Sequence, residues 1–369
     1  MTSLRATLKS ATALAAFSLS FPMASWAEEP IPVVATFSIL GDMVKRIGGE
    51  HIALTTLVGP DGDTHVYQPT PKAARSVAEA DVLFLNGLEF EGWLERLAES
   101  ASFDGAMVVA TKGVVPIAFD DHDDHDDHDD HDKHDDHDDH DDHADHDDHD
   151  DHADHDDHDD HDKHDDHDGH DDHDEHDKHD DHDNHDDHAG HDHGAFDPHA
   201  WHSLENAVIY ANNIAAGLAQ ADPENAGDYY ANRATFISEI ETLSADIDAM
   251  MKNLPSDKRT VVTAHDAFGY FGATYDLTFV APQGMSTESE ASAGDVAALI
   301  TQIREESISA VFIESLTDNR MIEQIANETG ATIGGMLYAG ALSAQSGPAS
   351  NYLDMMRHNA TTLFEALGN

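Results

Sequence analysis

The sequence predicts an α/β protein of two lobes, each with a mainly parallel sheet, joined by one long helix. Short β-branched runs alternate with amphipathic helical segments on both sides of a His/Asp-rich insertion, a pattern typical of parallel sheets covered on both faces. Between the two alternating series, residues 223–254 carry a single apolar stripe with no proline after the first turn. At 1.5 Å per residue this helix would be about 45 Å long, which suits a strut between lobes.

The first alternating series precedes the insertion. Its expected strands are rich in branched apolar residues and lie at 31–39, 52–58, 81–85 and 107–110. The helices expected between them lie around 44–47, from 71 to about 80, and at 90–97. The last of these places Trp93, Leu94 and Leu97 on one face, so we expect it to pack against the sheet.

The second series follows the insertion. Ser203 is a suitable cap for a first helix, and Asp222-Pro223 is a start signal for the linking helix, because aspartate caps helices and proline fits their first turn. The strands expected after the linking helix lie at 260–264, 277–281, 310–313 and 332–338. The helices expected there lie at 294–306, 318–329 and 351–367, with Gly330 as the stop of the second.

The whole chain divides into a leader, two lobes, a linking helix and the insertion. Residues 1–27 have a basic start, an apolar core and small residues before the end, so we expect a signal peptide that is cleaved after Ala27. The first lobe is expected at 28–222 and contains the insertion at 120–193. The linking helix at 223–254 leads into the second lobe at 255–369.

The insertion at 120–193 holds 25 of the 31 histidines and 40 of the 76 acidic residues of the chain. Its largest apolar side chain is alanine, so it cannot bury enough surface to offset the entropy of ordering, and we expect it to be disordered. A composition of this kind attracts metal ions. The insertion therefore indicates a divalent cation, whereas we expect the tight site in the ordered chain on either side.

Charge and cysteine content exclude several classes of function. With three lysines, the insertion contributes −37 to the net charge of −58, and the rest of the chain stands at −21. An acidic chain is a poor match for nucleic acid or for an anionic membrane surface, which both attract basic residues. The absence of cysteine excludes disulfides, thiolate zinc sites and a lipid-modified cysteine.

Three histidines stand where α/β proteins bind ligands, at or beyond the carboxyl ends of strands. His65 lies in the loop after the second strand, His199 in the first ordered turn after the insertion, and His265 at the end of a strand. Imidazole suits zinc, and three imidazoles leave one coordination position open. The other histidines outside the insertion are expected to be ordinary surface or core residues, although one of them, His202, lies close enough to compete: His51, His202 and His358.

Five segments carry a resemblance to a known family. They are Gly62–Pro71 (GDTHVYQPTP), Asp197–Trp201 (DPHAW), Ala264–Phe271 (AHDAFGYF), Phe312–Glu314 (FIE) and Gly347–Asn359 (GPASNYLDMMRHN). In these segments the chain resembles the metal-binding solute-binding proteins of the zinc and manganese ABC importers, above all the zinc-uptake members. The similarity covers nearly the whole chain after the leader, in order.

The resemblance implies two α/β lobes linked by a rigid helix, with the metal in the cleft between them. The implied ligands are His65 and His199 from the first lobe and His265 from the second. A histidine at the third position favours zinc, because manganese members tend to carry a carboxylate there. The zinc members also often carry a His/acidic loop at the position of the insertion.

One position departs from the family pattern. Many relatives place an aspartate ligand in the segment that reads Leu337–Leu342 in this chain, where the matching residue is Gly340. Because glycine offers no side chain, the fourth ligand is left open between water, Glu314 and a group from the insertion.

The sequence therefore predicts a periplasmic zinc-binding protein that captures Zn(II), delivers it to an ABC permease in the inner membrane, and is not an enzyme. We expect a monomer, with periplasmic zinc chaperones as further candidate partners and no nucleic acid. One alternative is a zinc-dependent hydrolase, for which Asp266 is the only obvious base beside a ligand. The other is a stand-alone periplasmic zinc store, which the insertion alone would support.

Overall fold

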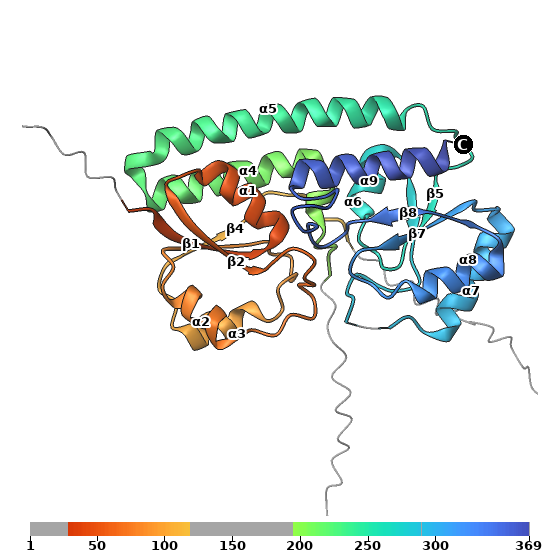
Figure 1. Ribbon diagram of the computed structural model, residues 1–369, viewed down its shortest axis with the longest axis horizontal. Coiled ribbons are helices and arrows are strands. Elements are labelled where there is room, and N and C mark those ends of the chain that lie inside the picture. The colour runs from red at the N-terminus through yellow and green to blue at the C-terminus, as the bar shows by residue number, and fades with distance from the viewer. Residues whose placement is uncertain (1–28, 119–194, 289, 369) are drawn as a thin grey trace, which may run out of the picture. The chain divides into compact units, whose positions relative to one another are not determined.

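Two four-stranded parallel sheets form the framework of the protein (Figure 1). The computed structural model describes residues 29–118, 195–288 and 290–368, which belong to one compact unit. The predicted leader and the predicted insertion lie outside the described residues. Among the helices of the described ranges, none has both the length and the apolar character needed to cross a membrane.

The first sheet has the strand order β2-β1-β3-β4, and all its pairs are parallel. Its strands are β1 (Ile31–Phe37), β2 (Ile52–Val58), β3 (Val82–Leu85) and β4 (Ala106–Val109). The central strand β1 is buried from Val33 onward, because helices lie on both faces of the sheet. The helices on one side are α1 (Ser38–Gly48) and α4 (Leu204–Ala221), and those on the other are α2 (Pro71–Ala78) and α3 (Leu94–Ala101).

The second sheet repeats the topology of the first, with the order β6-β5-β7-β8 and parallel pairs throughout. Its strands are β5 (Thr260–Val262), β6 (Thr278–Val280), β7 (Ala310–Glu314) and β8 (Thr332–Leu337). Its helices are α6 (Gly269–Tyr275), α7 (Ala293–Glu306), α8 (Arg320–Thr329) and α9 (Tyr352–Leu367). The predicted fold class of two α/β lobes with parallel sheets is confirmed.

Several element bounds differ from the prediction, among them the strand expected at 260–264, which ends at Val262. The first strand ends at Phe37 because Ser38 already begins α1. The helix expected at 90–97 begins only at Leu94, since the preceding residues form a turn in which Leu88 and Glu89 adopt positive φ angles of 54° and 61°. Helix α6 was not predicted, because its seven residues include two glycines and are too few to show a helical period.

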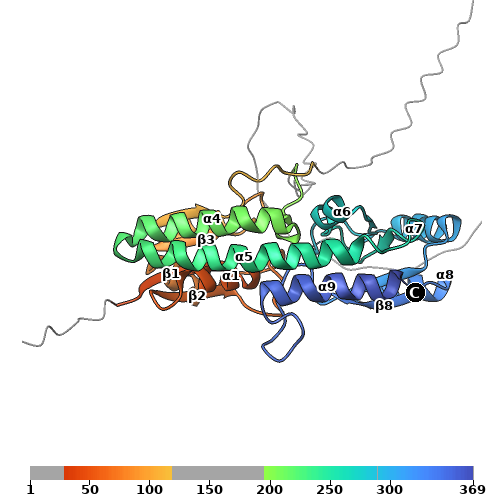
Figure 2. The ribbon, with the colours of Figure 1, turned by 90° about the horizontal axis from the view of Figure 1, so that it is seen from above.

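The long helix α5 (Ala226–Met251) packs against α1 and α4 of the first lobe and α9 of the second (Figure 2). Asp222 is a capping residue as predicted, because its carboxylate accepts the N–H of Asn225 at 3.4 Å. A short 3₁₀ turn, Pro223–Asn225, precedes the α-helix. The 26 residues of α5 extend about 39 Å, slightly less than the sequence suggested. The apolar stripe is buried as predicted: Phe236, Ile240, Leu243, Ile247 and Met251.

A continuous apolar core joins the two lobes on the side of α1, α4, α5 and α9. It contains Val33 and Phe84 of the first sheet together with Phe312 and Leu337 of the second. A separate, smaller core in the second lobe lies under α7 and α8 and includes Ile303 and Ile322. Because burial of apolar surface is the main favourable term in folding, the shared core holds the two sheets in a defined relation.

The strand order of each sheet reverses direction beside its first strand, and this fixes where a ligand can bind. In the first sheet the reversal lies at β1 and β3, and in the second at β5 and β7. Loops leave such a point in opposite directions and open a crevice at the carboxyl ends of the strands. A buried acidic side chain lies at each reversal: Glu91 bonds Thr36 of β1 and the residue after β3, and Glu314 bonds the two residues that lie shortly after β5.

Glu91 ties the first sheet to the segment that carries His199. Its carboxylate accepts the hydroxyl of Thr36 at 2.6 Å and the backbone N–H of Asn86 at 2.7 Å. The side chain of Asn86 in turn donates to the carbonyl of Pro198 at 2.9 Å. Since all these groups are buried, each hydrogen bond removes the cost of an unpaired polar group, and the network fixes the loop geometry.

Burial raises the pKa of Glu91 to about 6, although the hydrogen bonds from Thr36, Asn86 and Gly87 act to lower it. A raised folded-state pKa contributes stability that is fully present below the ordinary value near 4.5 and is lost as the pH rises through about 6. We therefore expect wild type to lose about 2 kcal/mol relative to Glu91→Gln between pH 4.5 and pH 7. Urea unfolding of both proteins across this range measures the difference, in which all other titrating groups cancel. A difference that does not change with pH would contradict the assignment.

Candidate metal centre

The structure brings the three predicted histidines together. His65 lies in the loop that follows β2, His199 directly precedes a 3₁₀ turn (Ala200–His202), and His265 lies three residues after β5. One nitrogen from each ring lies within 4.8 Å of the other two. Nε2 of His65 and Nε2 of His199 are 3.3 Å apart. Among the described residues this is the only group of three or more potential ligands that is close enough to hold a metal ion.

A carboxylate fixes the orientation of His199. Asp197 Oδ1 accepts the backbone N–H of His199 at 2.8 Å and lies 2.8 Å from its Nδ1. This contact occupies the Nδ1 side of the ring and leaves Nε2 on the side of the cluster. Pairing of one imidazole nitrogen with a carboxylate is the usual way in which proteins orient a histidine ligand and raise its basicity.

His265 is oriented by Glu314 in the same manner. Oε1 of Glu314 accepts the backbone N–H groups of Ala264 and His265 at 2.8 and 2.9 Å. Its Oε2 lies 2.5 Å from Nδ1 of His265. Glu314 was one of the options for a fourth ligand, but it faces the nitrogen of His265 on the far side from the cluster and is not part of the converging group.

The surroundings of the cluster favour the neutral form of His199, whereas the Glu314 carboxylate favours the charged form of His265. Burial lowers the pKa of His199 well below its ordinary value, and the neighbouring His265 acts in the same direction. Burial also acts to lower the pKa of His265, but the Glu314 carboxylate outweighs it, so the pKa of His265 is raised. Burial raises the pKa of Asp197 to about 7. The cluster thus has at least one neutral imidazole ready to donate a lone pair at neutral pH.

Aromatic rings surround the cluster on the side of the first lobe. The ring of Phe90 lies edge-on to His65 and to His199, with centroids 4.9 and 5.9 Å apart. Trp201 packs against both His199 and Phe90, at 5.3 and 4.9 Å. Trp201 and His199 are fully buried. These rings exclude water from the back of the cluster and lower the local dielectric, which strengthens any electrostatic interaction there.

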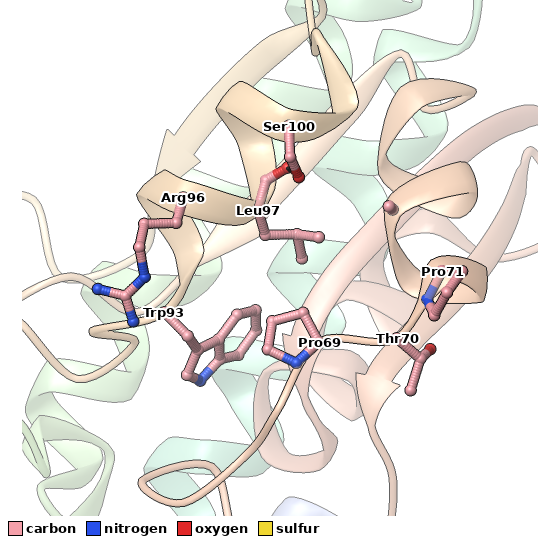
Figure 3. A pocket seen from close by; sticks show the side chains of 8 residues that line it. Pro69, Thr70, Pro71, Trp93, Arg96, Leu97 and Ser100 are labelled. Carbon is pink, nitrogen blue, oxygen red and sulfur yellow. Dashed lines mark hydrogen bonds between the residues drawn. The ribbon is translucent and has the colours of Figure 1, made fainter. Parts of the chain in front are cut away.

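The loop that carries His65 is held from behind by Trp93, whose indole N–H donates to the carbonyl of Thr64 at 2.9 Å. The ring of Tyr67 packs edge-on against Trp93 with centroids 4.8 Å apart. Figure 3 shows the outer side of this support, a surface pocket in which Pro69 and Pro71 face Trp93, Arg96 and Leu97. None of its lining residues is a candidate ligand, so the pocket marks the back of the loop and not the site.

A groove between the lobes opens beside His65. Asp63 and Val66 line it from the first lobe, and Gln283 and Thr287 line it from the second. The hydroxyl of Thr287 donates to Oδ2 of Asp63 at 2.6 Å, and Oδ1 of Asp63 accepts the backbone N–H of His65 at 2.9 Å. Because His65 is the least buried of the three histidines, an ion would reach the cluster from this side.

The other described histidines have structural contacts outside the cluster, as expected from the sequence. His51 lies 2.9 Å from Asp228, and His358 lies 3.0 Å from the carbonyl of Met336. Burial lowers the pKa of His202 to about 3, so this ring is neutral and its Nε2–H donates to the carbonyl of Ala339 at 3.0 Å. His202 thus contacts the second lobe through Nε2, and it is not a member of the converging group.

Sequence reasoning missed the residues that orient the ligands. Asp197 was part of a quoted motif, and its position two residues before His199 is a signal of a side chain that bonds the following backbone. Glu314 was considered only as a ligand. Trp201 was quoted as a motif residue, but nothing in the sequence shows that its indole N–H donates to the carbonyl of Ala339 at 2.9 Å. These roles depend on contacts between distant segments.

Gly340 is buried in a segment that both lobes hold in place. The carbonyl of Ala339 accepts from Trp201 and His202, and the N–H of Leu342 donates to the hydroxyl of Ser38 at 3.0 Å. A Cβ atom on Gly340 would meet only Cδ1 of Leu316, at 3.4 Å, and its φ lies outside the range that favours glycine. The position thus has room for a side chain, which this chain does not supply.

Two lobes of the same topology that meet over a buried group of converging imidazoles define a solute-binding protein whose solute is a metal ion. Comparison with known proteins agrees with this class. Residues 33–366 match the family described as "ZnuA: Zinc-uptake complex component A periplasmic", and the chain belongs to this family of metal ABC transporter substrate-binding proteins.

Relatives match along most of their length. The manganese-binding lipoprotein MntA of Halalkalibacterium halodurans is 25% identical over 340 residues, which is 92% of this chain and 89% of that protein. The iron-binding protein YfeA of Yersinia pestis is 26% identical over 336 residues, 91% of this chain and 86% of that protein. The structure of the periplasmic zinc-binding protein TroA from Treponema pallidum is similar in fold, with a TM-score of 0.69, 22% identity, and coverage of 92% of this chain and 99% of that chain.

Membership of this family decides between the alternatives. Its members bind a metal ion for an ABC importer and are not enzymes, so the hydrolase alternative is excluded. A substrate-binding protein of this kind works with a membrane permease, which also argues against a stand-alone store. The names of the two relatives specify manganese and iron, and that of the structure specifies zinc. The family description names zinc, but the relatives differ in the metal that their names give, so the comparisons together establish a metal ion as the solute without fixing which metal.

The space at Gly340 leads to a prediction about stability. Gly340→Ala should leave the free energy of unfolding of the metal-free protein unchanged or raise it by up to about 1 kcal/mol, because alanine reduces the entropy of the unfolded chain. The matched control is Gly272→Ala, whose Cβ would lie 2.5 Å from the carbonyl oxygen of Leu277. That clash should cost more than about 1 kcal/mol. Urea unfolding in the presence of a chelator measures both, and an equal loss for the two variants would show that Gly340 is crowded.

Proposed function

We propose that this chain is the periplasmic zinc-binding protein of an ABC importer, which captures Zn(II) through His65, His199 and His265 and delivers it to the membrane permease. The observation that carries the proposal is the convergence of three ring nitrogens within 4.8 Å of one another. Zinc–imidazole bonds of about 2.0–2.1 Å place ligand nitrogens roughly 3.3 Å apart around one ion. The separation of 3.3 Å between the nitrogens of His65 and His199 fits that arrangement.

The choice of zinc rests on the chemistry of the donors. Nitrogen ligands suit zinc, whereas manganese prefers carboxylate and other oxygen ligands. Both buried carboxylates beside the cluster, Asp197 and Glu314, face the Nδ1 side of a histidine and so support a ligand without being one. With Gly340 at the position where many relatives carry aspartate, the described residues offer the ion three imidazoles and leave one position for water or another group.

The delivery step follows from where the ligands lie. Two ligands come from the first lobe and one from the second, so movement of the lobes relative to each other would break the site and release the ion. In this proposal the first lobe is 28–222, the linking helix 223–254 and the second lobe 255–369. The predicted leader at 1–27 would direct the chain to the periplasm, and the insertion at 120–193 would hold further ions weakly nearby. We further propose a monomer that can accept zinc from periplasmic chaperones.

Replacement of a proposed ligand tests the site. His65→Ala, His199→Ala and His265→Ala should each weaken the tightest zinc site at least tenfold, because loss of one of three strong ligands should exceed about 1.4 kcal/mol. Zinc competition with a high-affinity chromophoric chelator, at less than one equivalent of zinc, measures the change. This condition fills the tight site first and leaves weak sites empty.

Two histidines outside the cluster serve as controls. His51→Ala and His358→Ala each remove an imidazole with a structural contact but no ligand role. Both variants should keep the zinc affinity of wild type within twofold. Similar losses in the control and ligand variants would mean that the site lies elsewhere.

Gly340→Asp tests the metal preference. A hard oxygen ligand would complete the coordination, so binding should tighten overall, and manganese affinity should rise by a larger factor than zinc affinity. The substitution is sterically reasonable because a Cβ at this position is in ordinary contact with Leu316. Parallel titrations with zinc and manganese give the ratio, and Gly340→Asn provides a control of similar size without the charge. If neither affinity changes while the fold is retained, position 340 does not face the metal.

A further inference from the structure

One tyrosine of the second lobe forms hydrogen bonds with both segments that flank the insertion. Tyr270, on α6, is buried, and its hydroxyl donates to the carbonyl of Asp197 at 2.9 Å. The same hydroxyl accepts the backbone N–H of Ile117 at 3.2 Å. Ile117 and Asp197 stand 80 positions apart in the sequence, and residues 119–194 lie between them. A single side chain thus satisfies one donor and one acceptor on two distant segments.

These two segments also pair directly with each other. The N–H of Asp197 donates to the carbonyl of Ile117 at 2.9 Å, and Ala118 and Phe196 form an antiparallel bridge. An isolated bridge with one neighbouring hydrogen bond is weak by itself, because two short strands are at best marginally stable. The hydroxyl of Tyr270 adds a second connection at the same point and anchors it to the other lobe.

Asp197 links this point to the proposed ligand His199. Its carbonyl accepts from Tyr270, while its carboxylate accepts the N–H of His199 and lies against Nδ1 of the same ring. The carboxylate also lies close to the start of α6, since a Cβ added to Gly269 would be 2.7 Å from its Oδ2. Asp197 is therefore positioned by two neighbouring residues of α6. Gly269 leaves room for its carboxylate, and the hydroxyl of Tyr270 bonds its carbonyl.

We propose that Gly269 and Tyr270 form a latch between the lobes that positions His199 through Asp197. Tyr270 touches neither the cluster nor an ion and acts as a positioning residue. The latch rests on the proposed metal site and adds the means by which the second lobe controls a ligand of the first. The latch also bonds both segments that flank the insertion, at Ile117 and Asp197. In this proposal a displacement of Ile117 would change the position of His199 through Asp197.

The test compares substitutions of the latch in the full-length chain. Tyr270→Phe removes only the hydroxyl, and Gly269→Ala places a methyl group where the Asp197 carboxylate lies. Each should weaken the tightest zinc site by about three- to tenfold, as expected when one buried hydrogen bond or its geometry is lost. The matched control is Tyr275→Phe, at the other end of α6, which should change zinc affinity by less than twofold. Zinc competition with a chromophoric chelator measures affinity, and thermal melting of the metal-free proteins reports stability separately.

A double-mutant cycle separates positioning from general stabilisation. If the latch acts through His199, Tyr270→Phe should have less than a twofold effect in a His199→Ala background and its full effect in a His65→Ala background. An equal loss in both backgrounds, or an unchanged affinity of Tyr270→Phe in the wild-type chain, would overturn the latch alone. If His199→Ala itself left zinc affinity unchanged, the proposed metal site would be wrong and the latch with it.

Discussion

Buried carboxylates that bond the backbone of loops beside the cluster are the constraint on which this structure depends. A carboxylate taken out of water must be compensated by hydrogen bonds, and in this protein the compensating donors are backbone N–H groups of the loops that build the site. Glu91 binds the turn after β3, Asp197 binds His199, and Glu314 binds the segment of His265. The hydrogen bonds that offset the burial of each acid thus also fix the conformation of the loop that donates them.

The two sheets have the same topology, and two of these acids bond loops at their carboxyl ends. In each sheet the strand order reverses beside the first strand, and Glu91 in the first sheet and Glu314 in the second bond backbone groups there. The second lobe uses its acid to support a ligand directly, because Glu314 lies against His265. In the first lobe Glu91 does not contact a histidine of the cluster through these bonds. It accepts the N–H of Asn86, whose side chain donates to the carbonyl of Pro198, the residue before His199. Two sheets of the same topology therefore position the histidines of one cluster through different contacts.

Reversible capture requires that the ligands be preorganised but not all on one rigid body. The aromatic wall and the carboxylates reduce the freedom that each imidazole loses on binding, which favours affinity. In the proposed site, the division of the three histidines between two lobes provides the opposite property, because a change in the relation of the lobes would remove a ligand. Hydrogen bonds across the interface at Ala339 and Leu342 oppose such a change on the side of the shared core. On the side of His65 the two lobes are also joined by the hydrogen bond from Thr287 to Asp63.

The sequence by itself determined the fold class and most element positions, and it singled out the three histidines that converge in the structure, because periodicity, caps and strand-end loops are local signals. It placed β2 at its observed bounds, and it located the Ser203 and Asp222 caps. It missed α6, which is too short to show a period, and it considered Glu314 as one option for a fourth ligand without showing its contact with His265. Only the tertiary structure places Glu314 against His265, the indole of Trp201 on the carbonyl of Ala339, and the hydroxyl of Tyr270 on the carbonyl of Asp197, since these partners lie far apart in the chain. Which nitrogen of a ring is available and whether Gly340 has room depend on contacts between segments, and no local pattern encodes them.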